Sequence, residues 1–375
     1  MIDQYTDLIR IAKRENNKKR NYLVINRLQG KHIPVRPGEA LGMFGQLADC
    51  LPQEYAGAKT LVIGFAETAT AIGAAVAIKR ETCYIQTTRE EIEGVSYLSF
   101  SEEHSHAIQQ RLVKQDLDRV MPQVDSVVFA EDEITTGKTI RNLTEALQRE
   151  YPYQVKYAAV SVFNAMDQKA LEQYHSRGIG LYYLIKTEQV DYTDRLRQYV
   201  RKGVSVNLMQ NPYEHARTGL QNEIRIKGQA NARRLVEAGA YKTACMHLWQ
   251  EIKRQLQDEL TGSVLVLGTE EFMYPALYVA DQIEKNGARV RFHATTRSPI
   301  EVYEEADYPL HVRYELPGLY EKDRRTFLYD IGNYDRVFIV TDACAGERVG
   351  TQALIRALVQ AQAAENNKIY MVRWC

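Results

Sequence analysis

The sequence has no run of about 18 uninterrupted apolar residues, so it predicts no membrane-spanning helix. Its most apolar stretch, residues 61–78, is interrupted by Glu67. The N-terminus lacks the basic and apolar segments of a secretory signal peptide. The chain also lacks an excess of charge, because 48 Lys and Arg residues balance 48 Asp and Glu residues. This balance removes the overall positive charge of a dedicated nucleic-acid-binding protein.

Cysteines are few and widely separated, and no Cys-x-x-Cys pair occurs among the five in the chain. The eight histidines include no His-Glu-x-x-His motif. These absences argue against a disulfide scaffold and against the common zinc sites. Together with the missing signal peptide they fit a protein of the reducing cytoplasm.

The chain is long enough for two domains, with 375 residues of which 45% are hydrophobic. Apolar runs alternate with helical periodicities, which is typical of an α/β protein with a largely parallel sheet. The predicted strands of the first half are Tyr22–Asn26, Thr60–Gly64, Cys83–Gln86, Ser126–Ala130 and Val155–Phe163. The predicted helices are Glu39–Cys50, Thr68–Lys79, Glu103–Arg119 and Lys138–Arg149.

The second half repeats this alternation after a predicted polar helix over residues 221–259. Its predicted elements are strands 263–267, 290–293, 336–341 and 368–372 and helices 274–285 and 349–359. The sequence Leu-Val-Ile-Gly at 61–64 is similar to Leu-Val-Leu-Gly at 265–268, and Thr-Thr-Arg occurs at both 87–89 and 295–297. This internal similarity indicates either a duplication or the general similarity of any two βαβ units.

One segment, residues 127–139, combines several features of a sugar-phosphate site. An apolar strand brings two adjacent carboxylates, Glu131 and Asp132, to its carboxyl end. A loop of threonines and glycine follows, and a helix is predicted from Lys138. Backbone N–H groups of such a loop and of the helix start bind an anion such as a phosphate monoester. Because carboxylates suit a ligand with neighbouring hydroxyl groups, the segment predicts binding of a sugar phosphate.

The segment has two other interpretations. The Gly-Lys-Thr sequence at 137–139 does not complete a nucleotide-triphosphate P-loop, because Asp132 stands where that motif requires its first glycine. A purely structural interpretation is an ordinary strand-to-helix turn in which Asp132 caps the helix.

Three further loops carry polar residues that suit phosphate chemistry. Residues 64–73 combine small side chains with threonines, although Thr68 could simply cap the next helix. Arg89 has the fork geometry that suits phosphate oxygens, or it is a solvated loop residue. His104 and His106 could move a proton near neutral pH, or they are surface residues at a helix start.

The segment 127–139 resembles the phosphoribosyl-diphosphate (PRPP) signature of type I phosphoribosyltransferases. About a dozen consecutive positions fit, with Glu131 where Asp is commoner. The resemblance implies that Glu131 and Asp132 hold the ribose hydroxyls and that residues 135–139 hold the 5-phosphate. It also implies that the small-residue loop and Arg89 bind the diphosphate, and that an N-terminal hood covers the acceptor.

The resemblance assigns residues to these roles by position. The implied PRPP-binding residues are Glu131, Asp132, Thr135, Thr136, Gly137, Lys138, Thr139, Glu67, Thr68, Ala69, Thr70, Thr88 and Arg89. The implied catalytic residues are Glu131, Asp132, Arg89, His104 and His106, and the acceptor candidates are Lys31 and His32.

Four segments together are similar to a narrower branch, the orotate-transferase-like enzymes found with bacterial tellurium-resistance and stress operons. These segments are residues 64–70, 87–90, 104–107 and 131–137. The second half resembles the domain that accompanies this branch, which is named after a Thr-Arg-Ser-Pro motif, present here at 296–299.

The expected architecture is therefore a parallel-sheet phosphoribosyltransferase domain with an N-terminal hood, residues 1–204, followed by a TRSP-like α/β domain, residues 205–375. In the second domain Glu271, Arg297 and Asp342 lie at predicted strand ends or loops, where open α/β sheets bind ligands.

The expected reaction is transfer of a phosphoribosyl group from PRPP to a nitrogenous base or base-like acceptor, with release of diphosphate. Mg²⁺ should be bound mainly through PRPP, so no all-protein metal site is predicted. The expected partners are PRPP and a small acceptor, with no nucleic acid and no membrane, and the resemblance leaves room for a homodimer and for partner enzymes of the same operon. The alternative is a non-catalytic module that senses PRPP.

Overall fold

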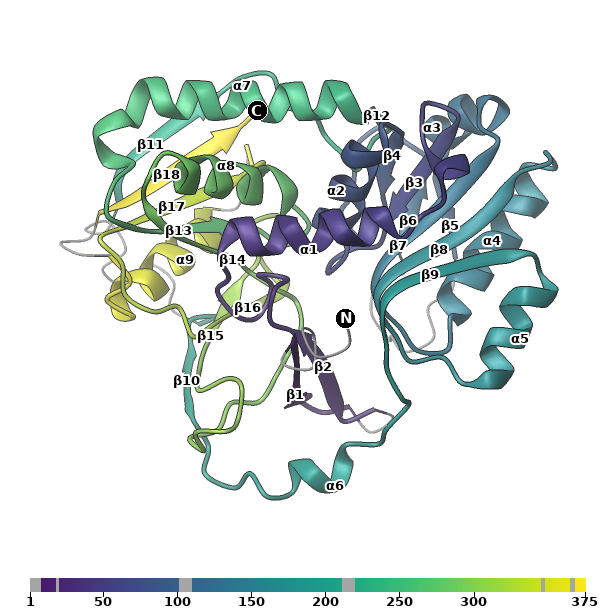
Figure 1. The fold of residues 1–375 in the computed structure, drawn as a ribbon. Coiled ribbons are helices and arrows are strands. Elements are labelled where there is room, and N and C mark those ends of the chain that lie inside the picture. Colours follow the sequence, from purple (N-terminus) through teal and green to yellow (C-terminus); the bar gives the residue numbers. More distant parts are fainter. Residues whose placement is uncertain (1–7, 18–19, 101–109, 211–219, 345–347, 365–367) are drawn as a thin grey trace. The chain divides into compact units, whose positions relative to one another are not determined.

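The structure is a computed structural model that describes residues 8–17, 20–100, 110–210, 220–344, 348–364 and 368–375. The chain forms two compact units (Figure 1). The first unit comprises Leu41–Val190 and Ala230–Ala244, and the second comprises Met1–Ala40, Asp191–Gln229 and Cys245–Cys375.

The first unit is built on a six-stranded sheet with the order β12-β4-β3-β7-β8-β9. All neighbours are parallel except β12, which pairs antiparallel with β4. Every residue of β3 is buried, as expected for a parallel strand covered on both faces. The strands are β3 (Thr60–Gly64), β4 (Cys83–Gln86), β7 (Ser126–Ile134), β8 (Lys156–Asn164), β9 (Ile179–Lys186) and β12 (Val236–Glu237), with a separate pair β5 (Tyr97–Ser99) and β6 (Arg111–Val113).

Helices connect these strands in two opposite directions. Helix α2 (Thr70–Arg80) leads from β3 to β4, whereas α4 (Lys138–Glu150) leads from β7 to β8 on the other side of β3. Right-handed crossovers therefore place α2 and α4 on opposite faces of the sheet (Figure 1). The connections diverge between β3 and β7, and this topological switch point is where open α/β sheets bind ligands. The remaining helices of the first unit are α3 (Lys114–Val120), α5 (Gln168–Ser176), η2 (Gln53–Tyr55) and η3 (Met121–Gln123).

The second unit contains a five-stranded parallel sheet with the order β11-β18-β17-β13-β14. Helix α8 (Tyr274–Lys285) leads from β13 to β14, and α9 (Arg348–Gln360) leads from β17 to β18. A second switch point therefore lies between β13 and β17. The strands are β11 (Leu220–Ile226), β13 (Ser263–Gly268), β14 (Arg289–Ala294), β17 (Arg336–Thr341) and β18 (Ile369–Trp374). Helix α6 (Thr193–Leu196) and η5 (Gln257–Glu259) also lie in this unit, while α1 (Pro37–Asp49) and α7 (Ala238–Leu256) contribute residues to both units.

The N-terminal segment belongs to the second unit. Its hairpin, β1 (Ile9–Lys13) with β2 (Tyr22–Asn26), contributes Ile11 and Ile25 to a buried cluster that also contains Tyr303 and Phe327. Arg313 adds an ion pair to Glu15 at 2.8 Å. The expected first domain included these residues, but long-range apolar packing groups them with the second half. A three-stranded sheet, β10 (Val204–Asn207), β15 (Val312–Pro317) and β16 (Arg325–Tyr329), completes this unit.

The strands and helices around both switch points are confirmed to within a few residues, but two predicted helices are wrong. The expected helix 221–259 is β11, β12 and only then α7. Strand β11 hides its signal because it alternates buried Ile224 and Ile226 with charged, exposed neighbours. The expected helix 103–119 contains β6, and α3 begins only at Lys114; residues 101–109 lie outside the described part of the chain.

The cysteine spacing argued against a disulfide scaffold, yet the structure contains a disulfide bond. Cys344, just after β17, and Cys375, just after β18, form a disulfide bond. Because β17 and β18 are parallel neighbours, their carboxyl ends meet although the two cysteines are 31 residues apart. Among the described residues, no helix has the length and apolar character needed to cross a membrane.

Candidate functional site

Three loops of the first unit begin side by side at the carboxyl edge of its sheet. The Phe65 N–H donates to the Ala130 carbonyl at 3.3 Å, and the Thr87 N–H donates to the Gly64 carbonyl at 2.9 Å. The loops that follow β3, β4 and β7 therefore start from neighbouring strand ends at the switch point. These loops contain most of the residues that the resemblance assigned to PRPP.

The acidic pair lies at the carboxyl end of β7. Glu131 and Asp132 are half-buried, and the Asp132 carboxylate accepts a hydrogen bond from the Glu133 N–H at 2.8 Å. The N-cap residue of α4 is Gly137, which has no side chain to accept a capping hydrogen bond, and Asp132 lies five residues before it. The structural interpretation of Asp132 as a helix cap is therefore excluded.

Gly137 is fixed in a conformation and a space that only glycine fits. Its φ is +64°, and an added Cβ would lie 2.2 Å from the Met166 Cε and 2.4 Å from the Tyr174 ring. The Tyr174 hydroxyl donates to the Gly137 carbonyl at 3.0 Å. Burial raises the pKa of Tyr174, so the phenol keeps the proton that it donates. No local sequence signal connects Tyr174 or Met166 with this loop, and Tyr174 lies 37 residues from Gly137 along the chain.

Thr135, Thr136, Lys138 and Thr139 complete the turn into α4. The threonines are half-buried and Lys138 is exposed. The Lys138 N–H donates to the Thr136 Oγ1 at 3.3 Å. No acidic side chain stands in the first turn of α4, so its N–H groups face no carboxylate of their own helix.

The loop after β3 is packed closely against its neighbours. The Ala66 N–H donates to the Thr87 Oγ1 at 2.7 Å, and the Thr70 hydroxyl donates to the Glu67 carbonyl at 3.3 Å. Glu67 is buried, with 8% of its surface exposed. Helix α2 is capped by Ala69 without a side-chain hydrogen bond, so Thr68 is not its cap. The second structural alternative is thus also excluded.

The loop after β4 carries Thr88 and Arg89. Backbone hydrogen bonds of 2.9 and 3.1 Å join Thr88 to Arg111, next to the half-buried Arg89. The Thr87 hydroxyl donates to the Gln110 side chain, a buried contact that sequence analysis did not predict. The proposed catalytic histidines, His104 and His106, lie outside the described residues.

The two acceptor candidates belong to the second unit. Lys31 is fully buried, and its Nζ donates to the Glu270 carbonyl at 2.6 Å. Burial, with a smaller contribution from Lys31, lowers the pKa of His32 to about 3. Both residues therefore lie with the candidates of the second half and belong to a different unit from the PRPP loops.

The second-half candidates make contacts within their own unit. Arg297 pairs with Glu270 at 2.8 Å and with Glu271 at 3.2 Å. The Asp342 carboxylate accepts hydrogen bonds from the Tyr320 hydroxyl and, at 3.0 Å, from the Gln229 amide.

Mg²⁺ fits the acidic pair of the first unit as a ligand-borne ion. In the described part of the chain, no cluster of three or more acidic, histidine or cysteine side chains could hold a metal. Glu131 and Asp132 offer the carboxylate oxygens that Mg²⁺ accepts alongside phosphate oxygens and water.

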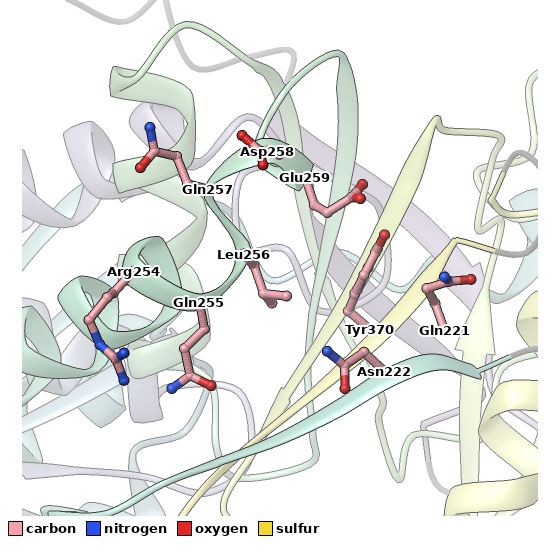
Figure 2. Close-up of a pocket in the computed structure, with 9 residues that line it drawn as sticks. All are labelled: Gln221, Asn222, Arg254, Gln255, Leu256, Gln257, Asp258, Glu259 and Tyr370. Atoms are coloured by element: carbon pink, nitrogen blue, oxygen red, sulfur yellow. The ribbon is translucent and has the colours of Figure 1, made fainter.

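A pocket of about 520 Å³ lies elsewhere, in the second unit (Figure 2). It is found at the amino ends of β11 and β18, where the Glu259 carboxylate pairs with Arg336 at 2.7 Å. Ligands of open α/β sheets bind at the opposite, carboxyl edge. Its lining residues are Gln221, Asn222, Arg254, Gln255, Leu256, Gln257, Asp258, Glu259 and Tyr370.

Several solved structures similar to this chain, at low identity, are phosphoribosyltransferases. Adenine phosphoribosyltransferase from Rhodothermus marinus is 12% identical with a TM-score of 0.35, and the match covers 50% of this chain and 98% of that one. The adenine enzyme from Giardia lamblia is 15% identical with a TM-score of 0.37, and the match covers 50% of this chain and 98% of that one. Orotate phosphoribosyltransferase from Aeropyrum pernix is 15% identical with a TM-score of 0.32, and the match covers 52% of this chain and 96% of that one. No curated protein sequence matches the chain.

Two family models match separate parts of the chain. Residues 8–188 match the model described as phosphoribosyl transferase. Residues 235–358 match the TRSP domain that stands C-terminal to that transferase. The first part of the chain therefore matches the phosphoribosyl transferase family, and the second part matches the domain that stands C-terminal to such a transferase.

Proposed function

We propose that the first unit binds PRPP at the switch point between β3 and β7 and transfers its phosphoribosyl group to a nitrogenous base or base-like acceptor. One observation carries this proposal. The polar loops after β3 and β7 meet at this switch point, and neither Thr68 nor Asp132 serves as a helix cap. A ligand with an anionic ester and neighbouring hydroxyls accounts for both loops.

Each loop is suited to one part of PRPP. Glu131 and Asp132 would accept hydrogen bonds from the ribose hydroxyls. The turn 135–139 would hold the 5-phosphate with backbone N–H groups and threonine hydroxyls. The loop 66–70 and Arg89 would bind the diphosphate, for which a guanidinium offers paired donors.

The reaction breaks the bond between C1 of ribose and the diphosphate oxygen, which keeps the bonding electrons. The acceptor nitrogen forms the new bond to C1 from the opposite face, and its proton leaves to solvent. Negative charge grows on the departing diphosphate, so fixed donors such as Arg89 would act most strongly at that stage. A bound Mg²⁺ would neutralise part of the same charge. The acidic pair would hold the ribose while its ring becomes more positive.

The setting of the reaction is also a proposal. The resemblance to the stress-operon branch supports a cytoplasmic enzyme with a small acceptor and partner enzymes of the same operon. His104 and His106, which lie outside the described residues, would contribute to catalysis.

The decisive experiment incubates the full chain with PRPP, Mg²⁺ and a panel of nitrogenous bases and follows diphosphate by mass spectrometry. We expect release that depends on one acceptor, which would identify the substrate. Calorimetry with PRPP alone gives a separate measure of binding. Binding without release, even when cell extract supplies the acceptors, would instead support the PRPP-sensing alternative, and absence of binding would reject both.

A further inference from the structure

The two switch points share the same backbone hydrogen bonds. In the first unit the Thr87 N–H donates to the Gly64 carbonyl at 2.9 Å, and in the second the Thr295 N–H donates to the Gly268 carbonyl at 3.1 Å. The next hydrogen bond is also repeated. The Ala66 N–H donates to the Thr87 Oγ1 at 2.7 Å, and the Glu270 N–H donates to the Thr295 Oγ1 at 3.0 Å.

The similarity continues beyond these loops. Thr88 forms an antiparallel bridge with Arg111 next to β5 and β6, and Thr296 forms one with Phe327 of β16. Arg89 and Arg297 directly follow the two bridging threonines. The core strand orders β4-β3-β7-β8 and β14-β13-β17-β18 also correspond. The two units therefore share one arrangement of strands and loops at their switch points.

One position differs between the two units in a way that changes the site. Glu270 stands in the second unit where Ala66 stands in the first. Its carboxylate is fully buried and accepts hydrogen bonds from Arg297 at 2.8 Å, Arg324 at 3.1 Å and the Leu319 N–H at 3.3 Å. The φ of Glu270 is +49°, a left-handed backbone conformation that carries a cost for any residue with a side chain. These contacts hold the carboxylate in place despite that cost.

The donors around Glu270 form a set that suits an anion. Both arginine side chains are largely buried, at 12% exposure, and the Leu319 N–H adds a third donor. Other carboxylates share the two guanidinium groups, because Arg297 also pairs with Glu271 at 3.2 Å and Arg324 with Glu321 at 2.6 Å. Arg324 and Leu319 come from the connection between β15 and β16, which is closed by a hydrogen bond from the Gly318 N–H to the Arg324 carbonyl at 2.8 Å. Two guanidinium groups and an N–H are the donors that a diphosphate requires.

We infer that the second unit contains a latent diphosphate site formed by Arg297, Arg324 and the Leu319 N–H, which the carboxylate of Glu270 occupies in the resting protein. The chain then has one open PRPP site and one corresponding site closed by its own side chain. The ligand class rests on the proposed function, because the diphosphate is carried over from the corresponding loops and Arg89 of the first unit. Removing the Glu270 carboxylate should open the second site.

The test counts diphosphate sites in the full chain. Inorganic diphosphate is titrated by calorimetry into the wild type and into Glu270→Gly, in which glycine keeps the positive φ without strain. We expect the variant to bind one more diphosphate than the wild type. Both tryptophans, Trp249 and Trp374, belong to the second unit. Diphosphate should therefore raise the tryptophan-monitored melting temperature of the variant by several degrees, and that of the wild type by much less.

Two further variants keep the inference falsifiable. Glu270→Gln retains the shape of the side chain but binds two guanidinium groups less strongly, so it should also gain the site, with weaker affinity than the glycine variant. Glu321→Gln removes a half-exposed carboxylate that pairs with Arg324 at 2.6 Å and should keep the wild-type count. If Glu270→Gly does not fold, Glu270→Gln decides the question.

Equal counts in wild type and both Glu270 variants, or an additional site already present in the wild type, would overturn the inference. The result is distinguishable from failure of the proposed function. If the first unit binds no diphosphate, the wild type shows no site and the variant shows one.

Discussion

The two units have similar backbone conformations at their switch points but carry different side chains there. In the first unit the loop after β3 has Ala66, and the turn after β7 runs through Gly137 into α4. In the second unit Glu270 stands at the position of Ala66 and pairs with two arginines. A shared fold thus leaves function undecided, and the chemistry follows from a few loop positions. Substitutions at corresponding positions of the two units separate effects on stability, which both units should show, from effects on PRPP binding, which only the first unit should show.

The largest expected effect comes from Gly137→Ala. The added methyl group would meet Met166 and Tyr174 within 2.4 Å and would also require a strained φ. We expect loss of at least ~2 kcal/mol of stability in the first unit and nearly complete loss of diphosphate release. Circular dichroism melting and the release assay measure the two effects.

Gly57→Ala is the matched control for this prediction, because Gly57 has a φ of +85° but no atom within 4 Å of an added Cβ. It should cost only about 1 kcal/mol and leave activity near the wild-type level. Similar losses in both variants would mean that the close packing of Gly137 has no special role.

Asp132→Asn and Asp342→Asn test the acidic position of each unit. We expect the first substitution to weaken PRPP binding by about 10- to 100-fold, because hydrogen bonds to a charged group contribute about 1.5–3 kcal/mol. Asp342 accepts from Tyr320 and Gln229 within the second unit, so its amide variant should leave PRPP affinity unchanged. Calorimetry measures the PRPP affinity of both variants. An equal loss of PRPP affinity in the two variants would contradict the prediction.

Acid should destabilise the second unit through two buried histidines. Burial lowers the pKa of His32 to about 3 and that of His293 to about 4. Below the ordinary value of 6.5, the unfolded chain binds protons that the folded chain does not, so stability falls as the pH decreases toward 4. The loss at pH 5 should be about 2 kcal/mol per histidine.

Urea unfolding followed by tryptophan fluorescence at pH 7.5 and pH 5 measures this loss in the second unit. His293→Gln should reduce the pH dependence, whereas His247→Gln, at an exposed position of the same unit, should not. A stability that is equal at both pH values would contradict the prediction.

The smallest effects are expected from Thr87→Val and Thr295→Val. Each removes the hydroxyl that accepts a loop N–H, from Ala66 or from Glu270, and should cost about 1–2 kcal/mol. Only Thr87→Val should also weaken PRPP binding, as measured by calorimetry. The comparison fails if Thr295→Val weakens it equally.

Local signals in the sequence accounted for most of the central strands. Strand β3 is an unbroken apolar run because parallel strands are buried on both faces. Strand β11 was missed because it is an edge strand of its sheet, with charged residues between Ile224 and Ile226. The packing of the N-terminal hairpin likewise has no local signal. Ile11 packs with Tyr303 in a buried cluster, and a single sequence carries no sign of such a distant pairing.

The candidate site shows the same limit. The segment 127–139 could be recognised because its strand, acidic pair and turn are consecutive. Tyr174 and Gln110, which support the loops from other parts of the chain, have no such pattern around them. The Glu270 ion pairs were also not predicted, since Arg324 and Glu270 are 54 residues apart.

The order of segments along the chain constrains how this protein can be divided. The backbone passes from one unit to the other after residues 40, 190, 229 and 244. Strand β12, the edge partner of β4, therefore reaches the first unit from a segment that follows most of that unit in the sequence. No single cut in the gene yields both units whole, so neither unit corresponds to one continuous segment of the chain.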